Sequence, residues 1–289
     1  MLLSTTTSLM SRSRPLEETI KIIKEAGFDA YDLTFCSLPN DHYFYGDDRM
    51  EMAKKLKDEA DKLGIVCNQA HAPFPTSTGD DEKDEKIFEL VVKSMEVAAY
   101  LGAKMIVVHP KQHLKYADFV DELFEMNVEF YKRLMPYAKK FGIKVATENM
   151  FQWHHNAGVC VTSTCAHPTE FIKYVDAVND PYLVACVDIG HAGLVDADPC
   201  DMLRRLGDRV GCLHVHDNNK VHDHHTLPYL GKIDWDGVTQ ALHDIGYKGD
   251  FTYEADSFLA TFPRELHPSC EKLMHDVGRH LISKIKANA

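Results

Sequence analysis

Acidic and imidazole side chains recur where apolar stretches of the chain end. Six stretches end, in chain order, at His71, at His109, at Glu148 and Asn149, at Asp188 and His191, at His214, His216 and Asp217, and at Glu254 and Asp256. Asp223 and His225 follow the fifth of these. Burying carboxylates and imidazoles beside apolar segments costs free energy unless a partner compensates. A divalent metal ion is such a partner, because it binds carboxylate oxygens and neutral imidazole nitrogens.

The sharpest subset is Glu148, Asp188, His214 and Glu254, with one residue from each of four successive stretches. A single acid at such a position is more often a helix N-cap than a ligand, so the interpretation depends on the set. Three carboxylates and one imidazole suit Mn²⁺, Mg²⁺, Co²⁺ or Zn²⁺, and the choice among these ions stays open.

A repeated unit along the chain would position these side chains. Amphipathic runs end in glycine and are followed at once by a short apolar run, at Gly27, Gly64, Gly102, Gly142 and Gly246. Glycine just past a helix end takes the left-handed conformation at little cost, so the pattern predicts alternating helices and strands. Strands are expected near Leu2–Ser8, Ala30–Phe35, Ile65–Ala70, Met105–His109, Lys144–Glu148, Leu183–Asp188, Cys212–His216 and Phe251–Glu254, with a last helix near Pro263–Lys286.

Eight such units in 289 residues predict an α/β fold, a closed (β/α)₈ TIM barrel that forms a single domain over residues 1–289. An open doubly wound sheet is the alternative, but its usual glycine-rich phosphate loop does not occur here. In a barrel the carboxyl ends of consecutive strands share one rim, where the candidate ligands would meet. The irregular piece Gln152–Pro168 is expected to be an active-site loop, and Tyr43, Phe44 and Tyr45 resemble a lid over a small ligand.

Composition removes several classes of protein. Hydrophobic residues at 45% and charged residues at 26% are typical of a folded protein rather than a disordered one. A net charge of −12 argues against a nucleic-acid partner, because duplex binding depends on Lys and Arg. No run of ~18 apolar residues could span a membrane. The N-terminus has no signal-peptide pattern, so a cytoplasmic protein with eight reduced cysteines is expected.

The sequence resembles the xylose-isomerase-like barrel superfamily of sugar isomerases and epimerases, which also contains endonuclease IV. The resemblance rests on seven motifs in the family's order: His71-Ala72-Pro73, Val107-Val108-His109-Pro110, Thr147-Glu148-Asn149, Asp188-Ile189-Gly190-His191-Ala192, His214-Val215-His216-Asp217-Asn218, Gly231-Lys232-Ile233-Asp234-Trp235 and Tyr253-Glu254.

Similarity to the ketose 3-epimerases implies that Glu148, Asp188, His214 and Glu254 hold one divalent cation. It also implies that Glu148 and Glu254 are the catalytic acid/base pair, which moves a proton through a metal-bound cis-enediolate. Return of the proton to the opposite face gives an epimer, and return to the other carbon gives an isomer. His191 matches the family histidine that contacts substrate oxygens. Lys220 occupies the position of a family arginine, so the resemblance implies that it binds substrate. The alternative is that Lys220 is an ordinary solvent-exposed lysine.

Three alternatives stay open. In endonuclease IV, three zinc ions use residues that match His71, His109, Glu148, Asp188, His191, His214, Asp223, His225 and Glu254, so a zinc phosphodiesterase acting on abasic DNA is the main rival. Other relatives are metal-dependent dehydratases of keto-inositols or dehydroshikimate-type acids. A sugar-binding barrel without metal is the non-enzymatic alternative.

The expected ligand is a small sugar or polyol. Phe74 and Trp153 are candidates to stack on sugar C–H surfaces, although loop packing explains them equally well. Lys220, Lys232 and Arg264 are too scattered to indicate a phosphate group. The family resemblance also implies a homo-oligomer, either a dimer or a tetramer.

Overall fold

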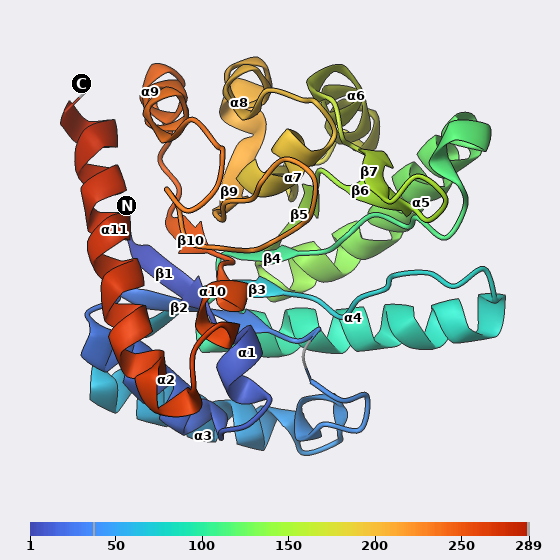
Figure 1. Cartoon of the computed structure of the whole chain (residues 1–289). Helices are drawn as coiled ribbons and strands as arrows, with labels where there is room; N and C mark the ends of the chain where they lie inside the picture. The colour runs from blue at the N-terminus through green and yellow to red at the C-terminus, as the bar shows by residue number, and fades with distance from the viewer. Residues whose placement is uncertain (37, 288–289) are drawn as a thin grey trace.

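The computed structural model describes residues 1–36 and 38–287 and consists of parallel strands surrounded by helices (Figure 1). Eight strands form one sheet in the order β10-β1-β2-β3-β4-β5-β8-β9. Their bounds are β1 Leu3–Thr6, β2 Ala30–Thr34, β3 Val66–His71, β4 Met105–Val107, β5 Lys144–Glu148, β8 Leu183–Asp188, β9 Val210–His214 and β10 Phe251–Tyr253. These are the eight expected strands, within a few residues at each end.

The sheet closes on itself between β9 and β10. A single parallel bridge pairs Val215 with Tyr253, and the amide of Glu254 donates to the carbonyl of Val215 at 3.1 Å. The predicted (β/α)₈ TIM barrel is therefore confirmed, and the closure brings the residue after β10 beside the residues that follow β9.

Helices cover the outside of the barrel. Their bounds are α1 Ser8–Ser11, α2 Leu16–Ala26, α3 Arg49–Leu63, α4 Asp81–Leu101, α5 Val120–Phe141, α6 Pro168–Val178, α7 Ile189–Leu194, α8 Pro199–Leu206, α9 Trp235–Asp244, α10 Asp256–Ala260 and α11 His267–Ala287. The five glycines at the predicted joints all have positive φ, as a left-handed helix end requires. The last helix begins slightly later than expected, after a 3₁₀ turn at Arg264–Leu266.

The segment expected to be an irregular loop contains a β-hairpin. β6 (Phe151–His154) pairs antiparallel with β7 (Val159–Thr162), and α6 already begins at Pro168. The β-branched residues of β7 favour an extended strand, and Gly158 takes positive φ at the hairpin tip. The expectation that Gln152–Pro168 is irregular was therefore wrong, because a ladder of paired strands holds this part of the barrel mouth.

The aromatic residues expected to form a lid belong to the core instead. Tyr43–Tyr45 form a 3₁₀ turn in which Phe44 and Tyr45 are buried, and both rings contact Phe35. Their apolar area is already removed from water by the barrel, so these two rings are not available to close over a ligand.

Two further findings bear on the expected setting of the protein. Within residues 1–36 and 38–287, no helix has the length and apolar character needed to cross a bilayer. The eight cysteines are all free of disulfide bonds.

Candidate active site

Four side chains from the ends of β5, β8, β9 and β10 converge at the rim of the barrel. Glu148, Asp188, His214 and Glu254 each offer a ligand atom, and these atoms all lie within 4.8 Å of one another. Nδ1 of His214 lies 3.0 Å from Oε1 of Glu148 and 3.0 Å from Oε2 of Glu254. One imidazole nitrogen thus faces two carboxylates, which is the arrangement expected around a shared cation.

Two more histidines extend this cluster along β3 and β4. Nε2 of His71 lies 2.9 Å from Nε2 of His109, which in turn lies 2.9 Å from Oε2 of Glu148. Nδ1 of His71 lies 2.8 Å from the carbonyl oxygen of Ala72, so this nitrogen carries a proton and donates it. In a neutral His71 the Nε2 lone pair therefore points at His109 and the cluster.

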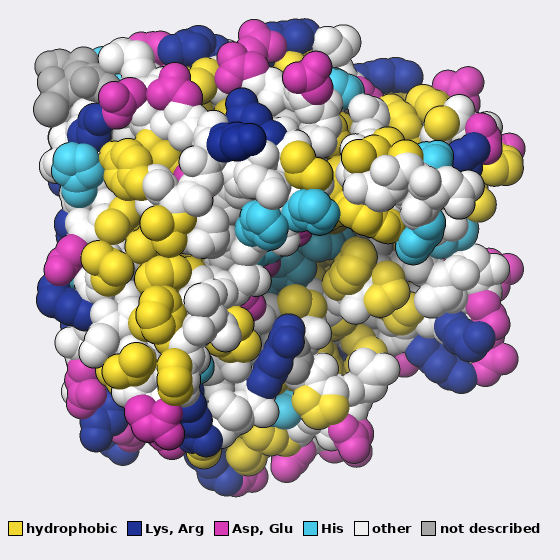
Figure 2. All heavy atoms as spheres, in the orientation of Figure 1, with side chains coloured by type: hydrophobic (Ala, Val, Ile, Leu, Met, Phe, Trp, Pro, Cys, Tyr) yellow, Lys and Arg dark blue, Asp and Glu magenta, His cyan; other side chains and the backbone are white. Residues whose placement is uncertain are grey.

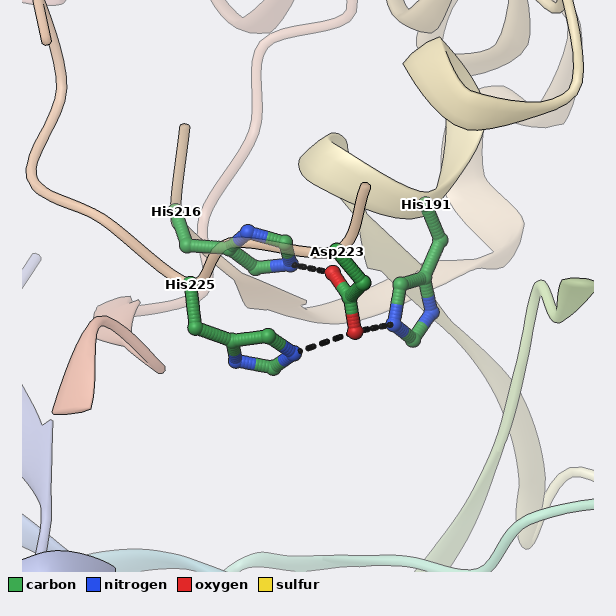
Figure 3. Close-up of side chains that lie close together, drawn as sticks. All are labelled: His191, His216, Asp223 and His225. Carbon is green, nitrogen blue, oxygen red and sulfur yellow. Dashed lines mark hydrogen bonds and ion pairs between the residues drawn. The ribbon is translucent and has the colours of Figure 1, made fainter. Parts of the chain in front are cut away.

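A second cluster lies beside the first and is centred on Asp223. Figure 3 shows His191, His216 and His225 directed at this one carboxylate. Nε2 of His225 lies 2.8 Å from Oδ2 of Asp223, Nε2 of His191 lies 3.6 Å from the same oxygen, and Nε2 of His216 lies 3.7 Å from Oδ1. His216 also connects the two clusters, because its Nε2 lies 3.0 Å from Oδ1 of Asp188.

Backbone carbonyls fix the orientation of two of the three histidines in this second cluster, His191 and His225. Nδ1 of His191 lies 3.0 Å from the carbonyl oxygen of Asn149, and Nδ1 of His225 lies 2.7 Å from that of Glu254. In both residues Nδ1–H therefore donates to a backbone carbonyl, and Nε2 faces the carboxylate of Asp223. Metal-binding histidines in proteins are commonly oriented in this way, by a hydrogen bond from the nitrogen that does not bind the metal.

Several buried polar atoms in the two clusters have no hydrogen-bond partner. Among them are Nδ1 of His109, Nε2 of His214, Nδ1 of His216 and Oδ1 of Asp223. Buried polar groups are nearly always satisfied, so unpartnered ones need an explanation. Carboxylate and imidazole donors of this kind fit a hard or borderline divalent cation, so the residues present fit the metal site that the sequence predicts.

The electrostatics favour ionised acids at the centre. Burial by itself would raise the pKa of the Glu148 carboxyl, but His214 and His109 outweigh it and hold that pKa well below its usual range. Burial would likewise lower the pKa of His191, whereas Asp188 and Asp223 outweigh it and raise the pKa to about 10. Positive charge is thus strongly favoured at this rim, whether it comes from protons or from a metal ion.

Comparison with known proteins agrees with this geometry. The family model of the xylose isomerase-like TIM barrel matches residues 20–266. The chain belongs to this family.

Proteins similar to this xylose isomerase-like barrel include a fructoselysine 3-epimerase and an inosose dehydratase. This chain is 23% identical to the fructoselysine 3-epimerase of Escherichia coli O157:H7 over 256 residues, which cover 86% of this chain and 89% of that protein. It is 25% identical to an inosose dehydratase of Clostridium perfringens (strain ATCC 13124) over 197 residues, covering 61% of this chain and 64% of that one. The crystal structure of a D-tagatose 3-epimerase-like protein superposes with a TM-score of 0.78 at 21% identity, covering 99% of both chains.

Local packing in this xylose isomerase-like barrel positions the clusters. The side chain of Asn149 accepts from the Asp188 amide at 2.8 Å and donates to the Asp188 carbonyl at 2.9 Å, which ties β5 to β8. A Cβ on Gly190 would lie only 2.0 Å from the ring of His216, so only glycine fits there. The Asp-Ile-Gly-His motif thus combines a candidate ligand with the space that His216 needs.

The Gly231–Trp235 motif anchors the loop that carries Asp223 and His225, because two of its residues donate hydrogen bonds to Asp217. Asp217 accepts hydrogen bonds from the amides of Tyr229 and Ile233 and from Nε1 of Trp235, at 3.0, 3.1 and 2.8 Å. These contacts close the segment around residues 219–226 onto the barrel, and so they hold the second cluster in place.

The predicted substrate residues differ in where they lie. Phe74 is 46% exposed, and its ring centroid is 4.7 Å from that of His109, directly beside the first cluster. Trp153 is half-exposed on β6 and faces His222 at 5.8 Å. The Lys220 side chain is exposed and, among the described residues, makes no hydrogen bond or ion pair with either cluster. The structure therefore does not bring Lys220 to the candidate ligands.

The sequence analysis missed one residue at the site, Asp32, and left another, His216, out of the proposed ligand set. Asp32 is buried in β2 with Oδ2 at 3.6 Å from Nε2 of His214, and Nε2 of Gln69 donates to the same oxygen at 3.0 Å. His216 joins both clusters but was not proposed as a ligand. An acid within the apolar run Ala30–Thr34 was the available signal for Asp32, since a carboxylate is rarely buried without a partner.

Proposed function

We propose that this protein is a divalent-metal-dependent epimerase or isomerase of a sugar or polyol, with Glu148 and Glu254 as its acid/base pair. The observation that carries the proposal is the position of these two carboxylates, each 3.0 Å from the same nitrogen of His214. Two ionised acids from β5 and from the end of β10 thus flank one point at the barrel rim.

The residues fit a two-base proton transfer. A divalent ion held by Glu148, Asp188, His214 and Glu254 would polarise a substrate carbonyl and acidify the neighbouring C–H. One glutamate accepts that proton at a carboxylate oxygen, and the other returns a proton to the opposite face of the same carbon, which inverts it. Delivery to the former carbonyl carbon would instead interconvert aldose and ketose.

The relatives support this reaction class and also a close alternative. The fructoselysine 3-epimerase and the inosose dehydratase share the fold family with this chain. Dehydration begins with the same proton abstraction and ends with loss of a β-hydroxyl as water, so the four candidate ligands fit either outcome.

The second cluster favours one further candidate function. His191, Asp223 and His225 lie together next to the first cluster, and His71 and His109 also face it. Up to three zinc ions and phosphodiester cleavage, as in endonuclease IV, would use these same side chains. The net charge of −12 counts against a DNA substrate.

The test is incubation of the metal-supplemented protein in D₂O with ketohexoses, inososes and an abasic DNA duplex. The proposal predicts solvent deuterium at the carbon next to the ketose carbonyl, together with the epimeric or isomeric sugar, by NMR. Elimination of water from an inosose would place the protein among the dehydratases. Nicking of the duplex without exchange into any sugar would overturn the proposal.

A further inference from the structure

Two adjoining cavities open beside the candidate active site. One of about 260 Å³ is lined by Phe74, Phe151 and Trp153 among others, and the other, of about 920 Å³, extends along the outer side of the β6–β7 hairpin. Both are lined by His113, Gln152 and Trp153, so they form one cleft. Figure 2 shows the face where histidines surround a hollow that has hydrophobic side chains beside it.

Two aromatic rings that line the smaller cavity separate it from the two candidate metal clusters. The ring of Phe74 packs edge-on against His109 at 4.7 Å, and the ring of Phe151 packs edge-on against His191 at 5.0 Å. The cleft thus begins one ring away from the clusters, at the distance where the part of a substrate that extends beyond the reacting carbons would lie.

The lining is nearly neutral. Among the described residues that line the two cavities there is no Asp or Glu, and the one cation, Lys115, is paired with Asp118 at 2.7 Å. Exposed rings of Phe74 and Trp153 alternate with the amide of Gln112, the imidazole of His113 and the hydroxyl of Ser77. Aromatic faces combined with neutral hydrogen-bonding groups suit a sugar ring, which has apolar C–H faces and hydroxyl edges.

The cleft is also held in shape before any ligand arrives. Gln152 accepts from the amide of Tyr116 at 2.9 Å and donates to the carbonyls of Gln112 and Leu114 at 3.2 and 2.7 Å. Ser77 holds Nδ1 of His113 at 2.7 Å. The hairpin and the loop after β4 thus form one fixed wall, which reduces the ordering cost of binding.

We infer that this cleft binds a second, neutral sugar ring linked to the reacting sugar, so that the substrate is a ketose-ended disaccharide or a related glycoside rather than a free monosaccharide. This rests on the proposed function. A phosphorylated substrate would need unpaired cations in the cleft, and an amine conjugate would need a carboxylate there.

Binding can be measured without catalysis. The chain has two tryptophans, Trp153 in the cleft and Trp235, which is buried and donates to Asp217. Because only Trp153 lines the cleft, a saturable change of tryptophan fluorescence on titration with cellobiose would report binding there. We expect Phe74→Ala to weaken cellobiose binding at least fivefold. The half-exposed Tyr100, on α4 and outside the cleft lining, provides the matched control, and Tyr100→Ala should leave the affinity unchanged. No saturable signal, or equal affinity in the Phe74→Ala variant, would overturn the inference.

Kinetics separate this inference from the proposed function. We expect deuterium exchange into 4-O-β-glucosyl-fructose to have a kcat/KM at least tenfold above that for fructose, and Trp153→Ala to lower the disaccharide value more than the fructose value. If kcat/KM is equal for both sugars and Trp153→Ala lowers both equally, the cleft does not bind a second sugar ring. The proposed epimerase or isomerase activity would still stand. If neither sugar exchanges, the reaction class fails, and the cellobiose titration alone decides on the cleft.

Discussion

Two regions of the molecule bury a glutamate completely, with opposite consequences. Glu148 lies at the barrel rim among His109, His191 and His214, and its pKa is held well below the usual range despite burial. Glu271 lies on α11 with both oxygens unpartnered, and burial raises its pKa to about 8. Burial alone neutralises an acid, so the ionised state at the rim is a product of the histidines that surround it.

The largest effect should come from removing the paired acids. We expect Glu148→Gln and Glu254→Gln each to reduce deuterium exchange by about 10³-fold, because an amide cannot accept the substrate proton. Glu271→Gln is the matched control, since it alters an equally buried glutamate far along the chain and should leave exchange unchanged. Normal exchange in either rim variant would remove that residue from the acid/base pair.

The lone acid should make its own contribution to how the unfolding free energy depends on pH. A pKa of about 8 in the folded state exceeds the unfolded value, so the stability that protonated Glu271 contributes is fully present below about pH 4.5 and is lost as the pH rises through about 8. We expect Glu271→Met to stabilise the protein at pH 8 by on the order of 3 kcal/mol. Urea unfolding at pH 5 and pH 8 measures this, and an unchanged pH dependence would show that Glu271 is ionised in the folded protein.

The pairing of Asp188 with His216 can be disturbed through a glycine. A Cβ at Gly190 would clash with the His216 ring, so Gly190→Ala should cost about 2 kcal/mol of unfolding free energy through overpacking. In the same helix, a Cβ at Gly193 meets Cδ1 of Ile233 at 2.9 Å, which is the movable end of a side chain. Gly193→Ala should therefore cost less, and equal costs would show that His216 can move aside.

A smaller effect is expected from the acid behind His214. Asp32 faces the nitrogen of His214 that points away from the carboxylates, so Asp32→Asn should weaken metal affinity ~10-fold by loosening the orientation of that ring. Isothermal titration with Mn²⁺ measures this. Unchanged affinity would show that β9 alone holds His214.

Much of this arrangement can be predicted from the sequence, because strand ends and helix ends are local signals. The glycine joints predicted the barrel, and the barrel rim then brought Glu148, Asp188, His214 and Glu254 together as expected. The environment of Asp32 was not predictable, since its partner His214 lies 182 residues further along the chain.

Exposure was also poorly predicted, because it depends on packing between distant segments. Phe44 looked available to a ligand and is fully buried.

The most direct test of a metal-dependent site is elemental analysis of protein purified without added metal, combined with activity before and after chelation. We expect about one tightly bound divalent ion per chain, with a second if Asp223 and its histidines are occupied, and loss of both metal and exchange in Asp188→Ala. Full deuterium exchange into the sugar by metal-free protein would show that the reaction does not depend on a metal ion. Three zinc ions per chain with nicking of abasic DNA would contradict the assignment to sugar chemistry.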